Sequence, residues 1–403
     1  MQEVVIAGYL RTAQSRSRPT DPARDWFGKM RADELLAKLL PELIKRVGIA
    51  PGEIDDFVVG SAMGVSENWS YGGRMPIFLA NLPETISAKF VDQQCGSAMA
   101  GIHIGTMEIQ TGNADVVMVG GMEHMTRIPM GGSTTDRGII APNAALFLDP
   151  SLTHWDMGTA MNMGLTAQKL LKKAGLTRED MDKWAVRSHQ LAAKAQENGF
   201  LDDEILPVEA PQADGSVLTV KTDQAVRGDT TLEGLLELKP AFKPGDDITA
   251  GNSSPLNAAA TSMILMSKET ARKKGVKPLA TIRSIGFAGV DPTIMGHGPV
   301  PASEKALAKA GLKASDIDFW EINEAFCIVV LNCIKDLGLD PEKVNVMGGG
   351  TAIGHPLGAT GVRLVGTLAR ILAAKNGRYG CANACVGGGQ GVATIIEREK
   401  YDW

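Results

Sequence analysis

The sequence has few cysteines, few aromatic residues and no long hydrophobic run. Five cysteines in 403 residues are too few for a disulfide scaffold, and an odd number of them cannot all be paired. They fit a reducing compartment with buried or reactive thiols. Aromatic residues make up 5% of the chain while glycine occurs 46 times, which indicates many tight turns and close backbone contacts. No apolar run reaches the roughly 20 residues that a membrane-spanning helix needs. We therefore expect neither a small secreted domain nor a membrane span.

A strong excess of charge of either sign is also absent. Lysine and arginine total 41, and aspartate and glutamate total 46, so the formal net charge is −5. This balance gives no reason to expect nucleic-acid binding, which requires a basic surface. The chain opens directly on a strand-like run at 3–8, with no apolar leader before it, so we expect a cytoplasmic protein. At 403 residues the chain is long enough for two or three domains.

Helices and apolar strands alternate through the first part of the chain. Apolar side chains spaced three and four apart predict an amphipathic helix over 29–47, which we expect Pro41 to kink or split. Strand-like runs follow at 57–60, 88–91 and 114–120. Continuous apolar strands that alternate with helices are typical of an α/β domain whose sheet is covered on both faces.

The same pattern occurs twice. Residues 311–318 match 48–55 in order and spacing, at an offset of 263, and each run leads into a strand. Cys95 and the glycine six residues after it are matched, at an offset of 260, by His355 and a glycine at the same spacing. Two such similar offsets predict a duplicated α/β unit in which Cys95 and His355 face one central cleft. The alternative is that α/β domains share generic helix–strand spacing.

Segment 125–249 breaks this pattern with clusters of Gly, Ser, Thr and Pro, and with helices predicted at 163–174 and 177–198. We expect an inserted loop domain that carries specificity. After it, a small-residue helix at 257–266 is expected to rejoin the first unit. The predicted division is an N-terminal half at 1–124 plus 250–276, an inserted domain at 125–249, and a C-terminal half at 277–403.

Cys95 follows a strand-like run and precedes an apolar, small-residue helix over 96–110. The unpaired N–H groups of a helix N-terminus stabilise a thiolate, which makes a cysteine nucleophilic. By itself, however, a lone cysteine in apolar surroundings is more often an inert core residue. Gly101 and Gly105 would let this helix pack closely against its neighbours.

Three further motifs, distant in sequence, supply complementary groups. Asn323 ends a strand, His355 lies on a glycine-rich loop at 347–358, and Cys385 precedes the glycine run that begins at Gly387. Glycines beside a reactive residue let backbone N–H groups approach a ligand, as an oxyanion hole requires. A cysteine with a histidine supports acyl transfer through a thioester. A second cysteine can serve as a general acid or base.

These motifs resemble those of the thiolase family over essentially the whole chain. DQQCGSAMAGIH is similar to the family's nucleophile motif, and NEAF, GGGTAIGHPLGATG and CVGGGQG follow in the family's order and spacing. DPTIMGHGPVPASEKALAKAGL and RSHQLAAKA resemble degradative bacterial-type 3-ketoacyl-CoA thiolases. The resemblance implies an α/β fold with duplicated βαβαβαββ units in a five-layer α-β-α-β-α core, and an inserted loop domain.

The resemblance also implies a reaction, the CoA-dependent cleavage of a 3-ketoacyl-CoA in β-oxidation. Cys95, activated by His355, would attack the keto carbon and keep the acyl group. Cys385 would protonate the departing acetyl-CoA and then deprotonate a second CoA. One oxyanion site would consist of His355 with a water held by Asn323. The other would consist of the backbone N–H groups of Cys95 and Gly387.

Four further positions match residues that meet CoA or the substrate in the family: Met163, Arg227, Ser254 and Phe326. Without the resemblance, Arg227 would be interpreted as a solvated charge in a turn, and Ser254 as the N-cap of a following helix. CoA is a substrate here, so we expect no cofactor. We expect no metal either, because Cys381, Cys385 and His355 lack the spacing and the fourth ligand of a zinc site.

Some positions depart from the family pattern, and they leave the acyl chain length open. Asn257 is followed by two alanines, Asn162 precedes Met163, and Gln390 lies in the last glycine loop. The alternatives are a short-chain acetyl-CoA C-acetyltransferase, a related ketoacyl synthase, and a non-catalytic acyl-CoA carrier. The resemblance further implies a homodimer or homotetramer, and a multifunctional β-oxidation subunit as a partner of some members.

Overall fold

The computed structural model describes residues 1–128 and 142–399. Ten strands form one mixed sheet in the order β10-β11-β12-β9-β1-β8-β5-β3-β4, with the short β2 paired to β8. The strands are β1 (Val4–Arg11), β2 (Ser15–Arg16), β3 (Asp56–Gly60), β4 (Ser87–Val91), β5 (Val116–His124), β8 (Asn257–Ser267), β9 (Ala280–Gly289), β10 (Phe319–Ile322), β11 (Tyr379–Val386) and β12 (Gln390–Arg398).

The strand order repeats on either side of the centre of the sheet. In one half β10, β11, β12 and β9 are neighbours, and in the other β3, β5, β8 and β1 follow the same order. These four strands form one parallel pair followed by two antiparallel pairs in each half, and β4 adds a second parallel pair, with β3, at the edge of the N-terminal half. The halves meet where β1 pairs with β9 over three residues only, Val4–Ile6. The duplicated α/β unit predicted from the sequence is therefore confirmed.

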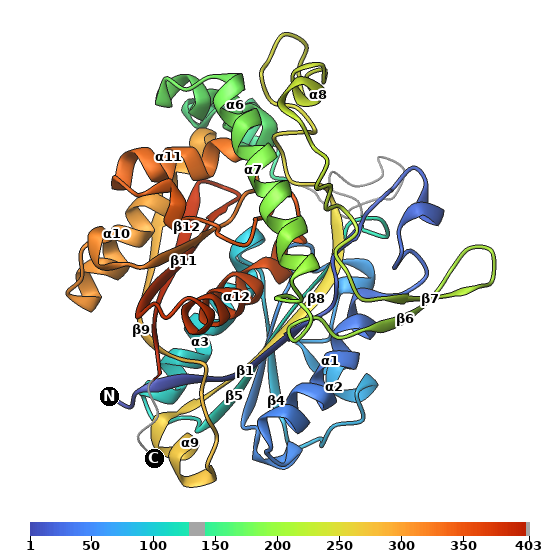
Figure 1. Cartoon of the computed structure of the whole chain (residues 1–403), viewed down its shortest axis with the longest axis vertical. Helices are drawn as coiled ribbons and strands as arrows, with labels where there is room; N and C mark the ends of the chain where they lie inside the picture. Colours follow the sequence, from blue (N-terminus) through green and yellow to red (C-terminus); the bar gives the residue numbers. More distant parts are fainter. Residues whose placement is uncertain (129–141, 400–403) are drawn as a thin grey trace.

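Helices cover both half-sheets on both faces (Figure 1). α3 (Ser97–Gln110) and α12 (Thr360–Ala374) pack against each other between the halves, in a core to which strands of both halves contribute. α1 (Ala32–Val47) covers the outer face of the N-terminal half. α10 (Pro299–Ala310) and α11 (Cys327–Leu337) cover the outer face of the C-terminal half. The result is the five-layer α-β-α-β-α arrangement.

Glycines permit the close packing of the two central helices. A Cβ atom at Gly361 would lie 2.3 Å from the backbone nitrogen of Met99, at the crossing of α12 and α3. A Cβ atom at Gly101 or Gly105 would lie 2.8 Å from a valine side chain of β5. Any side chain at these positions would push α3 away from α12 or from the sheet, as expected for Gly101 and Gly105.

One helical stretch of the described residues, Leu357–Ala374, is long and apolar enough to cross a membrane by length and composition. It contains α12, and 83% of it is buried inside the protein. Its apolar surface is therefore accounted for by the central layer between the two half-sheets.

The segment between β5 and β8 adds no described strand to the large sheet. β6 (Val208–Pro211) and β7 (Val217–Val220) pair only with each other, and α6 (Met163–Ala174) and α7 (Arg178–Glu197) pack onto the C-terminal half. The remaining α-helices are α2 (Arg74–Leu79), α4 (Ala145–Leu148), α5 (Met157–Ala160), α8 (Leu232–Leu236) and α9 (Lys268–Lys274).

One local prediction was wrong, and a second was wrong in part. The helix expected at 257–266 is the strand β8, whose side chains are all buried between β1 and β5. Its alanines favour a helix by propensity, but the neighbouring strands decide the conformation. Pro41 does not split the first helix, because α1 is one helix from Ala32 to Val47 and Pro41 lies on its exposed face.

Candidate active site

Cys95 lies in a short 3-10 turn, Gln94–Gly96, that leads directly into α3. The turn begins with Gln94 at φ 48°, a left-handed conformation that turns the chain sharply after β4. A Cβ atom at Gly96 would lie 2.9 Å from Val386, so the turn rests on the end of β11. Cys95 is 9% exposed, and its thiol accepts a hydrogen bond from the backbone N–H of Gly387.

Cys385 and Gly387 belong to the hairpin between β11 and β12. Cys385, near the end of β11, pairs with Gly391 and is fully buried. The connecting turn places Gly388 and Gly389 at φ 82° and 78°, where other residues would be strained. This tight turn directs the N–H of Gly387 toward the thiol of Cys95. The hairpin thus places a second thiol and a backbone donor beside the first thiol.

His355 is buried at the end of the glycine-rich loop and is held on two sides. Its backbone N–H donates to Asn257 Oδ1 at 2.9 Å, and its ring Nδ1 is 2.7 Å from Thr360 Oγ1. The preceding Gly354 has φ 127°, and a Cβ atom there would lie 2.5 Å from the Asn257 amide. Because Thr360 occupies Nδ1, the Nε2 nitrogen is the one available to a reactant.

Asn323 follows β10 directly and is completely buried. Its backbone N–H donates to the carbonyl of Asn383 on β11 at 2.9 Å. Its side-chain Nδ2 lies 3.3 Å from Nε2 and 3.4 Å from Nδ1 of His355. Its Oδ1 has no hydrogen-bond partner among the described residues. The structure therefore brings the predicted residues Cys95, Asn323, His355 and Cys385 together from both halves.

Burial sets the protonation states of these groups. It lowers the pKa of His355 to about 3, and the nearby Arg363 charge acts in the same direction. It raises the pKa of Cys95 to about 11, in spite of the hydrogen bond from Gly387. Burial also raises the pKa of Cys385 well above its usual range, and the neighbouring Cys95 adds to this shift. At pH 7 the resting site contains a neutral imidazole and two thiols, because burial outweighs the helix N-terminus at Cys95.

The residues assigned to CoA by resemblance lie in two places. Ser254 and Phe326 are adjacent, because the Ser254 N–H donates to the carbonyl of Ala325 at 3.0 Å. The ring of Phe326 lies 5.9 Å from that of Phe242, which in turn packs on the glycine after Met163 at the start of α6. Ser254 caps no helix, since β8 follows it.

Arg227 lies apart from these three residues, on a loop that packs against α7. Its backbone N–H donates to His189 Nδ1 at 3.2 Å, and its carbonyl accepts the hydroxyl of Thr230 at 2.8 Å. Its side chain is exposed and makes no hydrogen bond with a described residue.

Two buried carboxylates near the site were missed as site residues by the sequence reasoning. Glu123, on β5, accepts hydrogen bonds from the backbone N–H groups of Ala62 and Gly358, at 2.8 and 3.0 Å, and so joins the loops of both halves. Burial raises its pKa to about 7. Glu324 accepts from Trp184 Nε1 at 2.9 Å and from the N–H of Thr351 at 3.0 Å. A glutamate inside an otherwise apolar strand was the available signal for Glu123.

Other titratable residues lie outside the cluster. His103 is a buried core residue whose Nε2 is 3.0 Å from Thr394 Oγ1. Cys327 and Cys333 are buried in α11. Within residues 1–128 and 142–399, no group of three or more His, Cys, Asp or Glu side chains is arranged to hold a metal ion.

The raised pKa of Cys95 has a measurable consequence. Below its pKa the thiolate fraction of a thiol rises about tenfold per pH unit. We therefore expect the rate of Cys95 alkylation by iodoacetamide to increase steadily between pH 7 and pH 10, as followed by mass spectrometry of the Cys95 peptide. The urea-unfolded chain is the control, because its cysteines level off near their ordinary pKa. If the alkylation rate of Cys95 in the folded protein is already independent of pH at pH 7, the pKa of Cys95 is not raised.

Comparison with known proteins places the chain in a family. Residues 4–269 match the sequence model of the thiolase N-terminal domain, and residues 276–398 match that of the thiolase C-terminal domain. The 3-ketoacyl-CoA thiolase of Marinobacter nauticus is 41% identical over 402 residues, with 98% of each chain covered. That of Vibrio vulnificus is 41% identical over 403 residues, which is 99% of this chain and all of the relative.

A solved structure agrees with these matches. The acetyl-CoA acetyltransferase of Bacillus anthracis superposes with a TM-score of 0.86 and 36% identity, and 99% of each chain is covered. The family domains, the relatives and the solved structure all extend over nearly the whole sequence. The chain therefore belongs to the thiolase family.

Proposed function

We propose that the protein is a 3-ketoacyl-CoA thiolase, which cleaves a 3-ketoacyl-CoA with CoA to give acetyl-CoA and a shortened acyl-CoA. The observation that carries this proposal is the convergence of two thiols, an imidazole and an amide from four separate segments of the chain. It is supported by relatives named 3-ketoacyl-CoA thiolase that are about 41% identical over the full chain.

In the first half-reaction Cys95 transfers its proton to Nε2 of His355 as its sulfur attacks the keto carbon. The resulting alkoxide is stabilised by hydrogen-bond donors fixed in advance, among them the N–H groups of Cys95 and Gly387. Collapse of the alkoxide breaks the bond between C2 and C3, and the electron pair leaves on acetyl-CoA. Cys385 protonates this carbon, which leaves an acyl group on Cys95 and a thiolate on Cys385.

In the second half-reaction the Cys385 thiolate takes the proton of the incoming CoA thiol. The CoA sulfur attacks the acyl carbonyl, and Cys95 leaves and recovers its proton from His355. The oxyanion of this step forms on the same oxygen as before and is stabilised by the same N–H groups of Cys95 and Gly387. Protonated His355 and a water bound by the amide of Asn323 would instead stabilise the enolate oxygen of acetyl-CoA. A thioester is exchanged for a thioester, so the cycle consumes no cofactor. In the reverse direction Cys385 removes the α-proton of acetyl-CoA for a Claisen condensation.

The inserted segment 125–249 would carry CoA and substrate specificity between the halves 1–124 plus 250–276 and 277–403. Met163, Ser254 and Phe326 would line the pantetheine path, and Arg227 would meet the nucleotide. By analogy with the family, we propose a cytoplasmic homodimer or homotetramer that is able to associate with a β-oxidation subunit.

A short-chain acetyl-CoA C-acetyltransferase is the second candidate. The observation that favours it is the superposition on the Bacillus anthracis acetyl-CoA acetyltransferase, at a TM-score of 0.86. The two candidates share the same chemistry and differ in the acyl chain that they accept.

The test is incubation with 3-ketooctanoyl-CoA, followed by mass spectrometry and by a rate series from acetoacetyl-CoA to C16 3-ketoacyl-CoAs. We expect an acyl adduct on Cys95 and CoA-dependent cleavage, with higher kcat/KM for chains of six or more carbons. A rate confined to acetoacetyl-CoA would assign the short-chain activity. An unmodified Cys95 without any cleavage would contradict both enzymatic candidates and favour a non-catalytic acyl-CoA carrier. Cys95→Ser is the matched control, in which the adduct is expected to be lost.

A further inference from the structure

One buried carboxylate accepts hydrogen bonds from the segments on either side of the candidate active site. Glu123 lies on β5 and is 1% exposed. Its Oε1 accepts the hydroxyl of Ser61 at 3.0 Å and Nδ2 of Asn68 at 2.8 Å. Its Oε2 accepts the backbone N–H groups of Ala62 and Gly358, at 2.8 and 3.0 Å. These four bonds fill the acceptor capacity of a carboxylate, and one oxygen is shared between a loop of each half.

The contact with Ala62 leads to Cys95. The carbonyl of Ala62 accepts Nε2 of Gln94, the residue before Cys95, at 3.3 Å, and Ala62 and Cys95 belong to one buried apolar cluster. Just before this loop, a Cβ atom at Gly60 would lie 2.6 Å from the backbone nitrogen of Ala98 on α3. The segment fixed at Ala62 therefore packs against the turn and the helix that carry Cys95.

The contact with Gly358 leads to His355. Gly358 lies three residues after His355 in the glycine-rich loop, and between them the N–H of Leu357 donates to the carbonyl of His355 at 2.9 Å. A Cβ atom at Gly358 would lie 2.4 Å from Cα of Ser61, so the two loops are in direct contact there. The position of Glu123 Oε2 thus bears on both loops at once.

Burying a carboxylate at this position is costly. Glu123 forms no ion pair with any residue in the described part of the chain, and an ionised carboxylate away from water is unfavourable without such a partner. Burial raises its pKa to about 7, the hydrogen bonds from the two loops oppose this shift, and the charge of Asp92 adds to it. The pKa of Cys95 is raised mainly by its own burial, and the charges of Glu123 and Asp92 add to this effect. An apolar side chain would avoid the cost but would leave the four donors unsatisfied.

We propose that Glu123 is a positioning residue that sets the separation between Cys95 and His355. It does so by holding the backbones of Ala62 and Gly358 on one carboxylate oxygen. This rests on the proposed function, in which a proton passes from Cys95 to Nε2 of His355. Such a transfer requires the two groups to lie within hydrogen-bond reach, and a displacement of about 1 Å at a reacting group lowers a rate about 100-fold.

The test compares wild type with Glu123→Gln and Glu123→Asp at pH 9, where the carboxylate of Glu123 is ionised. Glutamine presents an NH2 group to donors that need an acceptor, and aspartate is one carbon too short to reach both loops. For acetoacetyl-CoA we expect kcat to fall about 100-fold in each variant, whereas KM should change little because the contacts of CoA are left in place. Wild-type kcat in either variant, or a KM that rises in step with the fall in kcat, overturns the proposal.

The rate of Cys95 alkylation by iodoacetamide at pH 9 distinguishes a misplaced loop from a lost fold. Glu123→Gln removes a negative charge that raises the pKa of Cys95, so alkylation should be faster than in wild type although cleavage is slower. Glu123→Asp keeps the charge, so alkylation should stay near the wild-type rate while cleavage is still impaired. If Cys95 in both variants reacts at the rate of the urea-unfolded chain, Glu123 stabilises the fold instead of the site, and the proposal is wrong.

Asp56→Asn is the matched control. Asp56 is a carboxylate of the same half, 5% exposed, at the opposite end of β3 from the loop that Glu123 binds, where it accepts the hydroxyl of Ser87 at 2.8 Å. This variant should keep the wild-type kcat and the wild-type alkylation rate. The alkylation measurement needs no substrate. If wild type cleaves no 3-ketoacyl-CoA, the proposed function fails, while faster alkylation in Glu123→Gln than in Glu123→Asp still shows that Glu123 acts on Cys95.

Discussion

A Cys385→Ala variant is expected to lose thiolysis by about 10²–10⁴-fold, the range typical of a general acid or base, while Cys95 still accepts an acetyl group from acetyl-CoA. Breaking the C2–C3 bond generates a carbanion that Cys385 must protonate, so cleavage depends on this thiol. Acetyl transfer from acetyl-CoA to Cys95 releases only a thiolate, which is a good leaving group without protonation. The substitution therefore separates the two kinds of step.

Three measurements on the Cys385→Ala variant test this expectation. They are the rate of acetoacetyl-CoA cleavage, the exchange of the acetyl-CoA α-protons in deuterium oxide, and the mass of the Cys95 peptide after incubation with acetyl-CoA. The first two should be lost and the third should show the acetyl group. Cys381→Ala is the matched control, since Cys381 is fully buried on the same strand, four residues earlier, with its sulfur 3.9 Å from Ser303 Oγ. Normal exchange in Cys385→Ala would contradict the acid/base assignment.

Much of the arrangement of the site could be predicted from the sequence because it follows from local rules. The strand that ends at Asn323, the turn at Cys95 and the glycine run after Cys385 are short-range features. The duplication then places Cys95 and His355 at equivalent positions. Cys95 precedes α3, which begins at Ser97, and His355 precedes α12, which begins at Thr360. The repeated spacing and the turn residues were therefore enough to predict that residues distant in sequence meet at one site.

Other features depend on contacts that a single sequence does not encode locally. The strand β8 contains Ala258–Ala260, which favour a helix, and only its position between β1 and β5 makes it a strand. Asn257 fixes the backbone of His355 from 98 residues away. The pKa of Cys95 likewise depends on burial by residues from both halves. The position of Cys95 at a helix N-terminus alone indicated a lowered pKa, whereas burial raises it.

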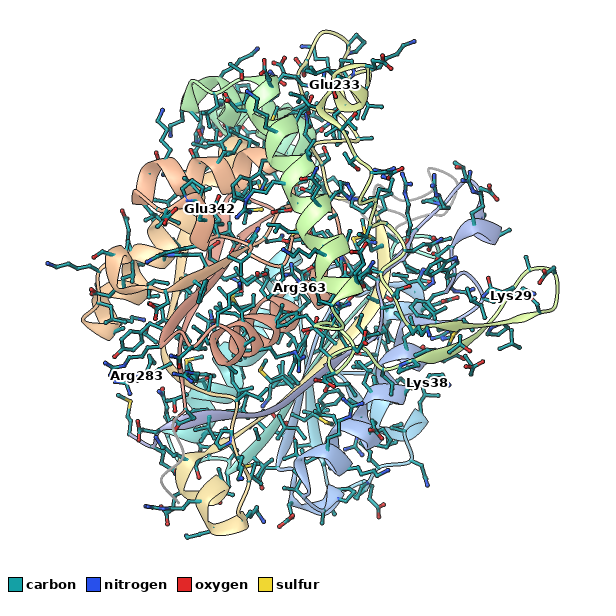
Figure 2. All side chains as sticks on the ribbon, viewed as in Figure 1. Lys29, Lys38, Glu233, Arg283, Glu342 and Arg363 are labelled. Atoms are coloured by element: carbon teal, nitrogen blue, oxygen red, sulfur yellow. The ribbon has the colours of Figure 1, made fainter. Side chains whose placement is uncertain are left out.

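A buried ion pair joins β10, which ends just before Asn323, to α12, which follows the loop that holds His355. Arg363 Nη1 lies 2.7 Å from Glu321 Oε2, and both side chains are at most 1% exposed. Glu321 is two residues before Asn323 on β10, and Arg363 is three residues after Thr360 on α12. Figure 2 shows Arg363 near the middle of the molecule. Burial raises the pKa of Glu321 to about 8, although the Arg363 charge opposes this shift, so the carboxyl is fully ionised only above this pH.

At pH 9, above the raised pKa of Glu321, a Glu321→Gln substitution is expected to lower the free energy of unfolding by about 3–5 kcal/mol, because it leaves the Arg363 charge buried without its ionised partner. Nε and Nη2 of Arg363 already have no hydrogen-bond partner among the described residues, so the loss of Glu321 would leave the guanidinium without a hydrogen bond to any of them. Urea unfolding followed by circular dichroism measures the loss. Replacing both partners, as Glu321→Leu with Arg363→Met, should restore most of it, because apolar side chains of similar volume remove the unpaired charge. If Glu321→Gln alone is as stable as the wild type, the buried charge of Arg363 does not depend on an ionised Glu321, and this prediction is wrong.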